Sequence, residues 1–430
     1  MGPESMEMTI MPARSIRGSL RLPGDKSISH RYALLAGLAN GRSVFENFAT
    51  GADCLSTLDC LKALGCGVEV NEKLSINGRG GTFQPSSSPL DCGNSGSTMR
   101  MLAGILAGHP FRSELRGDAS LSRRPMARII EPLRLMGADI LGNNGCAPIA
   151  ISGVARLRAV DYTLPVASAQ LKSCVLFAGL FAEGKTCVQE PVRTRDHSEL
   201  ALRAFGAYVE RSRTRVCVTG GATLRAIEAA IPGDLSTASF FLAAAALFPD
   251  SSLVFDSVLL NPTRAAILDT LAALGLKVSV LDAREQNGEL VGTIHVRGGA
   301  LRGVRISGAQ VAVLIDELPV LAAIAPFTSD GVEINDANEL RFKESDRLAA
   351  VSENLRRMGA TVEELQSGLR IPGGQSLHGA EIDSFGDHRI AMAFAVAALR
   401  AQGESVIKGA DAVKISCPEF FELLAAVTER

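Results

Sequence analysis

The feature that most constrains this 430-residue chain is an internal repeat of roughly 70 residues. An apolar segment rich in small residues, opened by a polar or glycine-containing turn, recurs along the chain. Its six copies lie at 29–39, 96–108, 168–182, 236–248, 316–327 and 387–401. A short β-like run follows the segment, as in SVFENF, KTCVQE and SVIKG. Chance similarity of Ala/Leu-rich helices explains one or two matches but not this alternation, which predicts an α/β (α+β) fold of six repeats.

A second, amphipathic helix follows and ends at glycine, as in ADCLSTLDCLKALG and SDRLAAVSENLRRMG. Two similar turns, Leu22-Pro23-Gly24-Asp25 and Ile231-Pro232-Gly233-Asp234, precede the first and fourth copies. Because Pro followed by Gly interrupts regular structure, we expect these turns to separate two halves of three repeats each. The expected domains are 22–232, and 233–430 together with 1–21. A small-molecule site is expected in the cleft between them.

Composition excludes several classes of protein. Lys and Arg number 44 against 46 Asp and Glu, so the near-neutral charge argues against binding nucleic acid or an anionic membrane. No apolar run reaches the roughly 18 residues that span a bilayer, and the N-terminus lacks a signal-peptide core. The nine cysteines are scattered without a CxxC or Cys/His cluster. We therefore expect a cytoplasmic protein with neither a metal site nor a disulfide framework.

Basic residues recur where the repeats begin. In Pro23-Gly24-Asp25-Lys26-Ser27-Ile28-Ser29-His30-Arg31, a glycine turn enters a helix with a Lys, hydroxyls and an Arg within two turns. Free N–H groups and the helix dipole make such a start suitable for an anion, although a solvated N-cap would look the same. The GxxxxGK[ST] loop of nucleotide-binding proteins is absent. GNSGSTMR at 93–100 is a second glycine-containing helix start of this kind.

Seven cations lie at equivalent ends of several repeats: Lys26, Arg31, Arg124, Arg195, Lys343, Arg347 and Arg389. Taken singly, each is explained by solvation or a surface salt bridge. If the halves face each other, the cations converge and suit a small substrate carrying phosphates and carboxylates. Asp316, which opens a helix immediately after an apolar strand-like run, could then act with Glu344 and His388 as acid and base.

Six longer motifs identify a family. In chain order they read LPGDKSISHR, LDCGNSGSTMRML, ASAQLKS, DELPVLA, LRFKESDRL and FGDHRIAMA. They resemble the 5-enolpyruvylshikimate-3-phosphate (EPSP) synthase family along essentially the whole chain. The resemblance implies a two-domain inside-out barrel of six βαβαββ units, three per domain. It also implies a monomeric enzyme of the shikimate pathway with no cofactor, which transfers the enolpyruvyl group of phosphoenolpyruvate to the 5-hydroxyl of shikimate 3-phosphate through a tetrahedral intermediate.

The same resemblance assigns roles to individual residues. For shikimate 3-phosphate it implies contacts from Lys26, Ser27, Arg31, Ser168, Ala169, Gln170, Arg195, Asp316 and Lys343. For phosphoenolpyruvate it implies contacts from Lys26, Asn94, Gly96, Arg124, Gln170, Arg347, His388 and Arg389. Asp316 resembles the base for the 5-hydroxyl, and Glu344 with Lys26 resembles the proton donor to the vinyl carbon.

Two departures from the family pattern bear on function. Ile415 stands where some members have a Lys, with Lys414 one residue earlier. Gly96 stands where glyphosate-tolerant members have Ala, and the space that a glycine leaves predicts glyphosate sensitivity. Two other readings compete: a UDP-N-acetylglucosamine enolpyruvyl transferase, disfavoured because 112–136 holds no Cys, and a binding protein for phosphorylated metabolites, which would not need Asp316 and Glu344 together.

Overall fold

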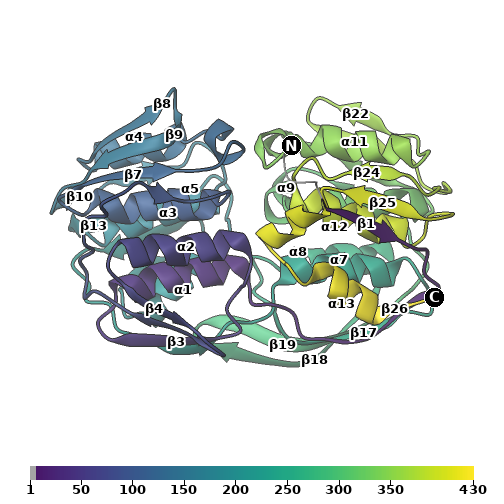
Figure 1. Ribbon diagram of the computed structural model, residues 1–430, viewed down its shortest axis with the longest axis horizontal. Helices are drawn as coiled ribbons and strands as arrows, with labels where there is room; N and C mark the ends of the chain where they lie inside the picture. The colour runs from purple at the N-terminus through teal and green to yellow at the C-terminus, as the bar shows by residue number, and fades with distance from the viewer. Residues whose placement is uncertain (1–5) are drawn as a thin grey trace. The chain divides into compact units, whose positions relative to one another are not determined.

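The computed structural model describes residues 6–430 and divides into two compact units (Figure 1). Unit 2 comprises Gly24–Ile231 and the short segment Gln286–Glu289. Unit 1 comprises the chain up to Pro23, Pro232–Glu285 and Leu290–Arg430. The main crossings of the chain between the units therefore lie at its two Pro-Gly pairs.

Three four-stranded sheets of unit 2 share one strand order. They are β16(Glu228–Ala230)-β3(Arg42–Glu46)-β5(Leu74–Asn77)-β4(Gly67–Val70), β6(Leu90–Asp91)-β7(Arg112–Arg116)-β9(Cys146–Ser152)-β8(Asp139–Asn143) and β11(Asp161–Thr163)-β13(Lys185–Gln189)-β15(Arg215–Thr219)-β14(Val209–Arg211). In each, the first two strands are parallel, and the third is antiparallel to the second and fourth. A short pair, β10(Leu157–Arg158) and β12(Ala182–Glu183), completes the strands of this unit in the described chain.

The helices of unit 2 are α1(Lys26–Leu38), α2(Ala52–Ala63), α3(Gly96–Ala107), α4(Ala127–Leu135), α5(Ala169–Gly179) and α6(His197–Ala204), with a 3-10 turn η1(Leu121–Arg123). Helices α1, α3 and α5 are buried almost all round, and Figure 1 shows them lying between the β3 and β7 sheets. Their small apolar residues suit helices with no solvent-facing side. A Cβ at Gly104 would lie 2.2 Å from the carbonyl oxygen of Cys174, so this glycine lets α3 pack closely against α5.

Two of the three sheets of unit 1 contain the same four-strand order, and the third, with three strands, matches the first three. Its sheets are β18(Lys277–Gln286)-β19(Glu289–Arg297)-β17(Ser252–Leu259)-β2(Ser15–Leu20)-β26(Thr428–Glu429), β20(Val304–Ile306)-β21(Val332–Ile334)-β23(Gly368–Ile371)-β22(Glu363–Leu365) and β1(Glu7–Ile10)-β25(Ser405–Lys408)-β24(Glu381–Asp383). The second has the parallel and antiparallel pairing of the unit 2 sheets. Strands β2, β17, β19 and β18 follow the same order within the first.

The β18–β19 hairpin is long, and its tip is grouped with unit 2. There, Nδ1 of buried His197 lies 2.6 Å from the Glu289 carboxylate, and the Gln286 amide donates to the Ala230 carbonyl at 3.0 Å. Four residues distant in sequence thus contact unit 2, with Glu289 buried beside His197.

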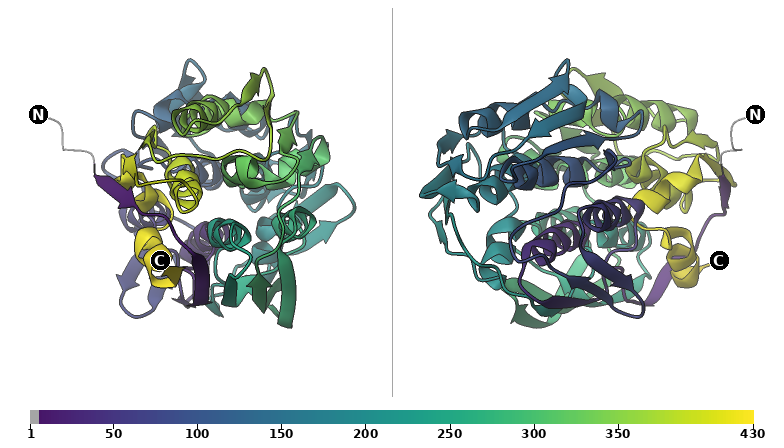
Figure 2. Two further views of the ribbon diagram at one scale, coloured as in Figure 1. Left: turned by 90° about the vertical axis from the view of Figure 1, so that its right-hand side faces the viewer. Right: turned by 60° about the vertical axis from the view of Figure 1, so that its left-hand side comes forward.

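The helices of unit 1 are α7(Leu235–Ala246), α8(Ala266–Leu274), α9(Ala309–Leu314), α10(Leu318–Ile324), α11(Arg347–Arg357), α12(His388–Ala398) and α13(Phe420–Val427). Its 3-10 segments are η2(Ala325–Phe327), η3(Asn338–Phe342) and η4(Ala410–Ile415). The left view of Figure 2 turns unit 1 toward the viewer, with its C-terminal helices in yellow. One expectation is wrong: the apolar run before Asp316 is the helix α9, not a strand. Val311 and Leu314 are buried at helical spacing while Gln310 is exposed. Periodicity alone cannot separate a short buried strand from a short helix.

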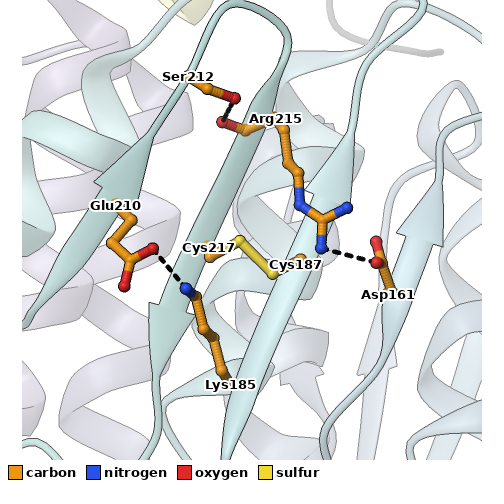
Figure 3. Close-up of a disulfide and its surroundings, with 7 residues drawn as sticks. All are labelled: Asp161, Lys185, Cys187, Glu210, Ser212, Arg215 and Cys217. Atoms are coloured by element: carbon orange, nitrogen blue, oxygen red, sulfur yellow. Dashed lines mark hydrogen bonds and ion pairs between the residues drawn. A yellow bond between two sulfur atoms is a disulfide. The ribbon is translucent and has the colours of Figure 1, made fainter.

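A disulfide links Cys187 of β13 to Cys217 of β15, a bond that the expectation of no disulfide framework did not include (Figure 3). The two residues are direct partners in the antiparallel ladder, with Cα atoms 4.1 Å apart. They are 30 residues apart in sequence, and no spacing motif marks them. Only the strand register brings them together. Ion pairs of Lys185 with Glu210 and of Arg215 with Asp161 flank the bond on the same sheet (Figure 3).

We expect reduction of this disulfide to lower the free energy of unfolding of unit 2 by about 2–4 kcal/mol, because a cross-link of this kind restricts the unfolded chain. Thiol titration of the denatured protein should count seven thiols before treatment with a dithiol and nine after it. Cys187→Ser should lower the melting temperature by as much as reduction does. Cys146→Ser, at a half-buried free cysteine, is the control and should leave stability nearly unchanged. Nine thiols in the untreated protein would contradict the pairing.

No helix among the described residues is long and apolar enough to cross a membrane. No group of three or more His, Cys, Asp or Glu side chains within residues 6–430 is arranged to hold a metal ion.

Candidate active site

The N-termini of α1, α3 and α5 carry most of the predicted site residues of unit 2. Each helix begins at a side chain that accepts a hydrogen bond from its first turn: Asp25 from the Ile28 amide at 2.8 Å, Ser95 from the Thr98 amide at 3.1 Å and Ser168 from the Leu171 amide at 3.3 Å. The first turn of any helix has further N–H groups and a partial positive charge. Three such starts in one unit favour anionic ligands.

Arg31 links α1 to α5 and α6. Its Nε donates to Ser198 Oγ at 2.7 Å, Nη2 donates to Ser173 Oγ at 2.9 Å, and Nη1 donates to the Ser27 carbonyl at 2.8 Å. Burial lowers the Arg31 pKa to about 10; the charge of Glu199 acts against this shift, and that of Arg195 adds to it. Arg31 is therefore a buried cation that still carries its charge at neutral pH, with a second guanidinium close enough to repel it.

Lys26 opens α1, and its Nζ lies 2.9 Å from Asp53 Oδ2 of α2. Burial, followed by the charges of Lys26 and Arg31, holds the pKa of the neighbouring His30 well below its usual range. His30 is thus neutral, and its Nδ1 lies 2.7 Å from Thr57 Oγ1. Lys26 therefore has the Asp53 carboxylate as a partner at the start of α1. The neutral His30 adds no further positive charge there.

Asn94, Arg124 and Gln170 form a second group around the start of α3. Arg124 Nη2 donates to Asn94 Oδ1 at 2.6 Å, and Gln170 Nε2 donates to Ser97 Oγ at 2.8 Å. Arg100, which the sequence predictions omit, donates through Nη1 to Gln170 Oε1. Arg100 lies four residues after Gly96, hence on the same face of the helix, and that spacing is the signal that could have identified it.

Gly96 makes the close packing of these groups possible. A Cβ at this position would lie 3.0 Å from Arg100 Nη1 and 3.5 Å from Arg124 Nη1. The missing side chain therefore lets two guanidinium groups approach the first turn of α3.

In unit 1, the fully buried Arg347 is the centre of an ionic cluster. Its Nε donates to Asp387 Oδ2 at 2.8 Å, and its Nη2 donates to Glu344 Oε2 at 2.6 Å and to Asp387 Oδ1 at 3.2 Å. Burial alone lowers the Arg347 pKa, but the charges of Asp387, Glu344 and Asp316 outweigh it and raise that pKa above its ordinary value. The guanidinium therefore stays charged.

Three cations surround the Asp316 carboxylate just before α10. Lys343 Nζ lies 3.8 Å and Arg347 Nη1 3.5 Å from Oδ1, and Arg389 Nη2 lies 3.8 Å from Oδ2. Arg389 Nη1 also donates to the Asp316 carbonyl at 2.7 Å. The Asp316 side chain keeps 16% of its surface exposed. A partly accessible carboxylate held among cations can accept a hydrogen bond or a proton from a ligand that these cations attract.

Asp387 is a functional candidate that the sequence interpretation treats only as a helix cap. It does cap α12, accepting from the Arg389 amide at 2.9 Å, but it also binds Arg347 and accepts from Ser345 Oγ at 3.0 Å. His388 Nδ1 lies 3.9 Å from the Asp387 carboxylate. Lys414, which stands one residue before the position where some family members have a Lys, lies in η4 with an exposed side chain.

The predicted site residues are divided between the two units. Unit 2 holds Lys26, Ser27, Arg31, Asn94, Gly96, Arg124, Ser168, Ala169, Gln170 and Arg195. Unit 1 holds Asp316, Lys343, Glu344, Arg347, His388 and Arg389. The contacts above join the unit 1 residues into one cluster. In unit 2 they link Ser27 to Arg31 on α1 and gather Asn94, Gly96, Arg124 and Gln170 around the start of α3.

Known proteins resemble this chain over its whole length. The family model for EPSP synthase (3-phosphoshikimate 1-carboxyvinyltransferase) matches residues 10–424. The 3-phosphoshikimate 1-carboxyvinyltransferase of Koribacter versatilis is 62% identical over 98% of this chain and 99% of its own, and that of Solibacter usitatus is 53% identical over 99% and 100%. A solved EPSP synthase from Acinetobacter baumannii aligns with a TM-score of 0.87 at 38% identity, covering 98% of both chains. Its mixed α/β fold is that of the present structure, and the chain belongs to the EPSP synthase family.

Proposed function

We propose that the protein transfers the enolpyruvyl group of phosphoenolpyruvate to the 5-hydroxyl of shikimate 3-phosphate and releases phosphate, a step toward chorismate and the aromatic amino acids. Membership of the family supports this activity. Within the structure, the observation that carries it is the Asp316 carboxylate among Lys343, Arg347 and Arg389. This cluster combines a proton acceptor with the charge that an anionic substrate pair needs.

The finer features of the family are also proposals for this chain. The recurring strand order supports βαβαββ units. Family membership is the ground for proposing that six of them, three per domain, form a two-domain inside-out barrel. The enzyme would work in the cytoplasm as a monomer. A cleft shared by the two units remains a prediction.

The unit 2 residues are assigned mainly to shikimate 3-phosphate. Lys26, Ser27, Arg31 and Arg195 would bind its phosphate and hydroxyls, with Ser168, Ala169 and Gln170 at the start of α5. The short bonds of Arg31 to two serine hydroxyls support this role, because hydroxyls can turn and give up such bonds to a phosphate oxygen. Lys343 and Asp316 of unit 1 would contact the same substrate.

Phosphoenolpyruvate is assigned to Lys26, Asn94, Gly96, Arg124, Gln170, Arg347, His388 and Arg389. The geometry of Arg124 and Arg100 at Gly96 supports an anion at the start of α3, because two guanidinium groups converge there. Guanidinium groups bind carboxylates and phosphates through paired N–H donors.

The reaction has two stages, addition of the 5-hydroxyl to phosphoenolpyruvate and elimination of phosphate, and each requires proton transfer. Glu344, with Lys26, would protonate the vinyl carbon of phosphoenolpyruvate, which gives its central carbon oxocarbenium character. Asp316 would accept the proton of the attacking 5-hydroxyl, forming a tetrahedral intermediate. Loss of a proton from the methyl carbon together with phosphate restores the vinyl ether. Arg347 supports both carboxylates, because it is bonded to Glu344 and lies 3.5 Å from Asp316.

A phosphate-release assay with purified protein and phosphoenolpyruvate tests the proposal. Phosphate should appear with shikimate 3-phosphate as the acceptor and not with UDP-N-acetylglucosamine. Release with the second acceptor only would assign the chain to the related transferase reaction. Binding of shikimate 3-phosphate without any turnover would favour a binding protein.

Gly96→Ala is expected to raise the glyphosate concentration that gives half inhibition by about tenfold or more. An added Cβ would meet the guanidinium groups of Arg100 and Arg124, so it takes space from an inhibitor longer than phosphoenolpyruvate. The KM for phosphoenolpyruvate should rise less, and kcat serves as the internal control for correct folding. The wild-type enzyme itself should lose activity in millimolar glyphosate at low phosphoenolpyruvate. Equal sensitivity of the two proteins would contradict this assignment of Gly96.

A further inference from the structure

Three ionisable side chains lie buried together beneath the start of α5, and none of them belongs to the predicted site. Lys172 is 0% exposed, Glu190 2% and Glu199 1%. Lys172 Nζ donates to Glu199 Oε1 at 2.8 Å and to Glu190 Oε2 at 3.1 Å. Burying three charges is expensive, and apolar residues of similar volume would serve stability as well or better. The cluster therefore invites an explanation other than stability.

The two carboxylates hold opposite ends of one segment. Glu190, just after β13, accepts from the Thr194 amide at 3.1 Å and from the Thr194 hydroxyl, so it fixes the backbone immediately before Arg195. Glu199 lies in the first turn of α6, next to Ser198. Because Lys172 binds both carboxylates, one ammonium group fastens the segment 190–199 to α5.

This segment and α5 together surround Arg31. Ser198 Oγ accepts from Arg31 Nε and lies 2.6 Å from Ser173 Oγ, which accepts from Arg31 Nη2. Ser173 follows Lys172 directly on α5. The charge of Glu199 also raises the Arg31 pKa, against the effect of burial. Lys172 thus acts on Arg31 through the placement of Ser198 and through the neighbouring carboxylate.

We propose that Lys172 is a positioning residue for phosphate recognition: it holds the segment 190–199 so that Arg195 and Arg31 are arranged for the phosphate of shikimate 3-phosphate. The inference rests on the proposed function for the identity of this substrate. Without Lys172, the buried carboxylates of Glu190 and Glu199 lose their ammonium partner. We expect the Arg31 guanidinium, on which the charge of Glu199 already acts, to turn toward Glu199. Burial already raises the pKa of Glu199, and the loss of Lys172 removes the charge that opposes this rise.

Lys172→Met tests the proposal, with Lys172→Arg as the conservative variant. We expect the dissociation constant for shikimate 3-phosphate, measured by calorimetry, to rise about tenfold or more in Lys172→Met. The KM for phosphoenolpyruvate at saturating shikimate 3-phosphate should change less than about threefold, and Lys172→Arg should recover most of the affinity. Hydrogen exchange should show faster exchange of the Thr194 amide, which the Glu190 carboxylate protects in the wild type.

Cys174→Ala is the matched control. Cys174 is fully buried on the same helix, but its thiol faces Gly104 of α3 and not the segment 190–199. This variant should lower the melting temperature without changing affinity for shikimate 3-phosphate or exchange at Thr194.

If Lys172→Met fails to fold, the double variant Lys172→Met/Glu199→Gln decides the question, because it removes one of the two carboxylates that Lys172→Met leaves uncompensated. Weaker binding of shikimate 3-phosphate with an unchanged KM for phosphoenolpyruvate supports the proposal in either variant. Wild-type affinity in a folded variant overturns it and leaves Lys172 a structural residue. A wild-type protein that binds no shikimate 3-phosphate refutes the proposed function instead, and exchange at Thr194 still reports whether Lys172 holds the segment.

Discussion

Asp316→Asn lowers kcat by about 10²–10⁴-fold if Asp316 takes the proton of the attacking hydroxyl, which is the usual contribution of a positioned general base. The amide keeps the shape and one acceptor of the carboxylate but cannot accept a proton at neutral pH. Binding of shikimate 3-phosphate should therefore weaken much less than turnover falls. Steady-state kinetics at saturating substrates, together with calorimetry, measure both quantities.

The control for this variant is Asp330→Asn, at an exposed position of the same unit. It should leave kcat and both KM values within about twofold, as surface substitutions usually do. A wild-type kcat in Asp316→Asn combined with a raised KM for shikimate 3-phosphate would make Asp316 a binding residue and not a base.

Arg347→Met should lower the free energy of unfolding of unit 1 by about 3–5 kcal/mol, because removing one member of a buried ionic group leaves its partners uncompensated. The partners here are Asp387, with a 0% exposed side chain, and Glu344. The Arg347 pKa is raised in the folded state, so its stabilising charge is present at all pH values below the ordinary arginine pKa and is lost only above it. The penalty of the variant should therefore appear throughout the neutral range.

Arg357→Met provides the comparison on the same helix. Arg357 of α11 pairs with Glu353 one turn earlier, and both side chains are more than one-third exposed. Such surface pairs contribute about 0.3–0.5 kcal/mol, so this variant should be nearly as stable as the wild type. Urea unfolding followed by hydrogen exchange in unit 1 distinguishes the two variants. Equal free energies of unfolding for Arg347→Met and Arg357→Met would show that the carboxylates of Asp387 and Glu344 do not need the charge of Arg347.

The sequence predicts the helix starts well because their signals are local. Asp25 and Asp234 each follow a Pro-Gly pair that the sequence marks as a break, and they cap α1 and α7, a position that Asp favours. The sequence also identifies the cation-rich motifs that begin or precede α1, α11 and α12, because their residues are contiguous in the chain. Helix α9 was missed because six residues are too few to show a period.

Contacts between distant segments are what the sequence could not reveal. Cys187 and Cys217 meet through strand register alone. Asp387 reads as a cap until Arg347, 40 residues earlier, is placed beside it. Lys172 lies in an apolar helix where a single Lys predicts nothing, and its role depends on two carboxylates 18 and 27 residues away. Buried ionic groups of this kind are set by tertiary packing and leave no periodic trace.

The hairpin tip at Gln286–Glu289 sets a limit on dissecting the protein by truncation. A fragment that ends at Ile231 would contain His197 but not Glu289. The buried imidazole of His197 would then lose its carboxylate partner. Such a recombinant fragment should be less soluble than one in which the tip is grafted back through a short linker. Unit 2 is therefore not formed by one continuous stretch of the chain. A chimaera that exchanges units between relatives must carry Gln286–Glu289 together with Gly24–Ile231.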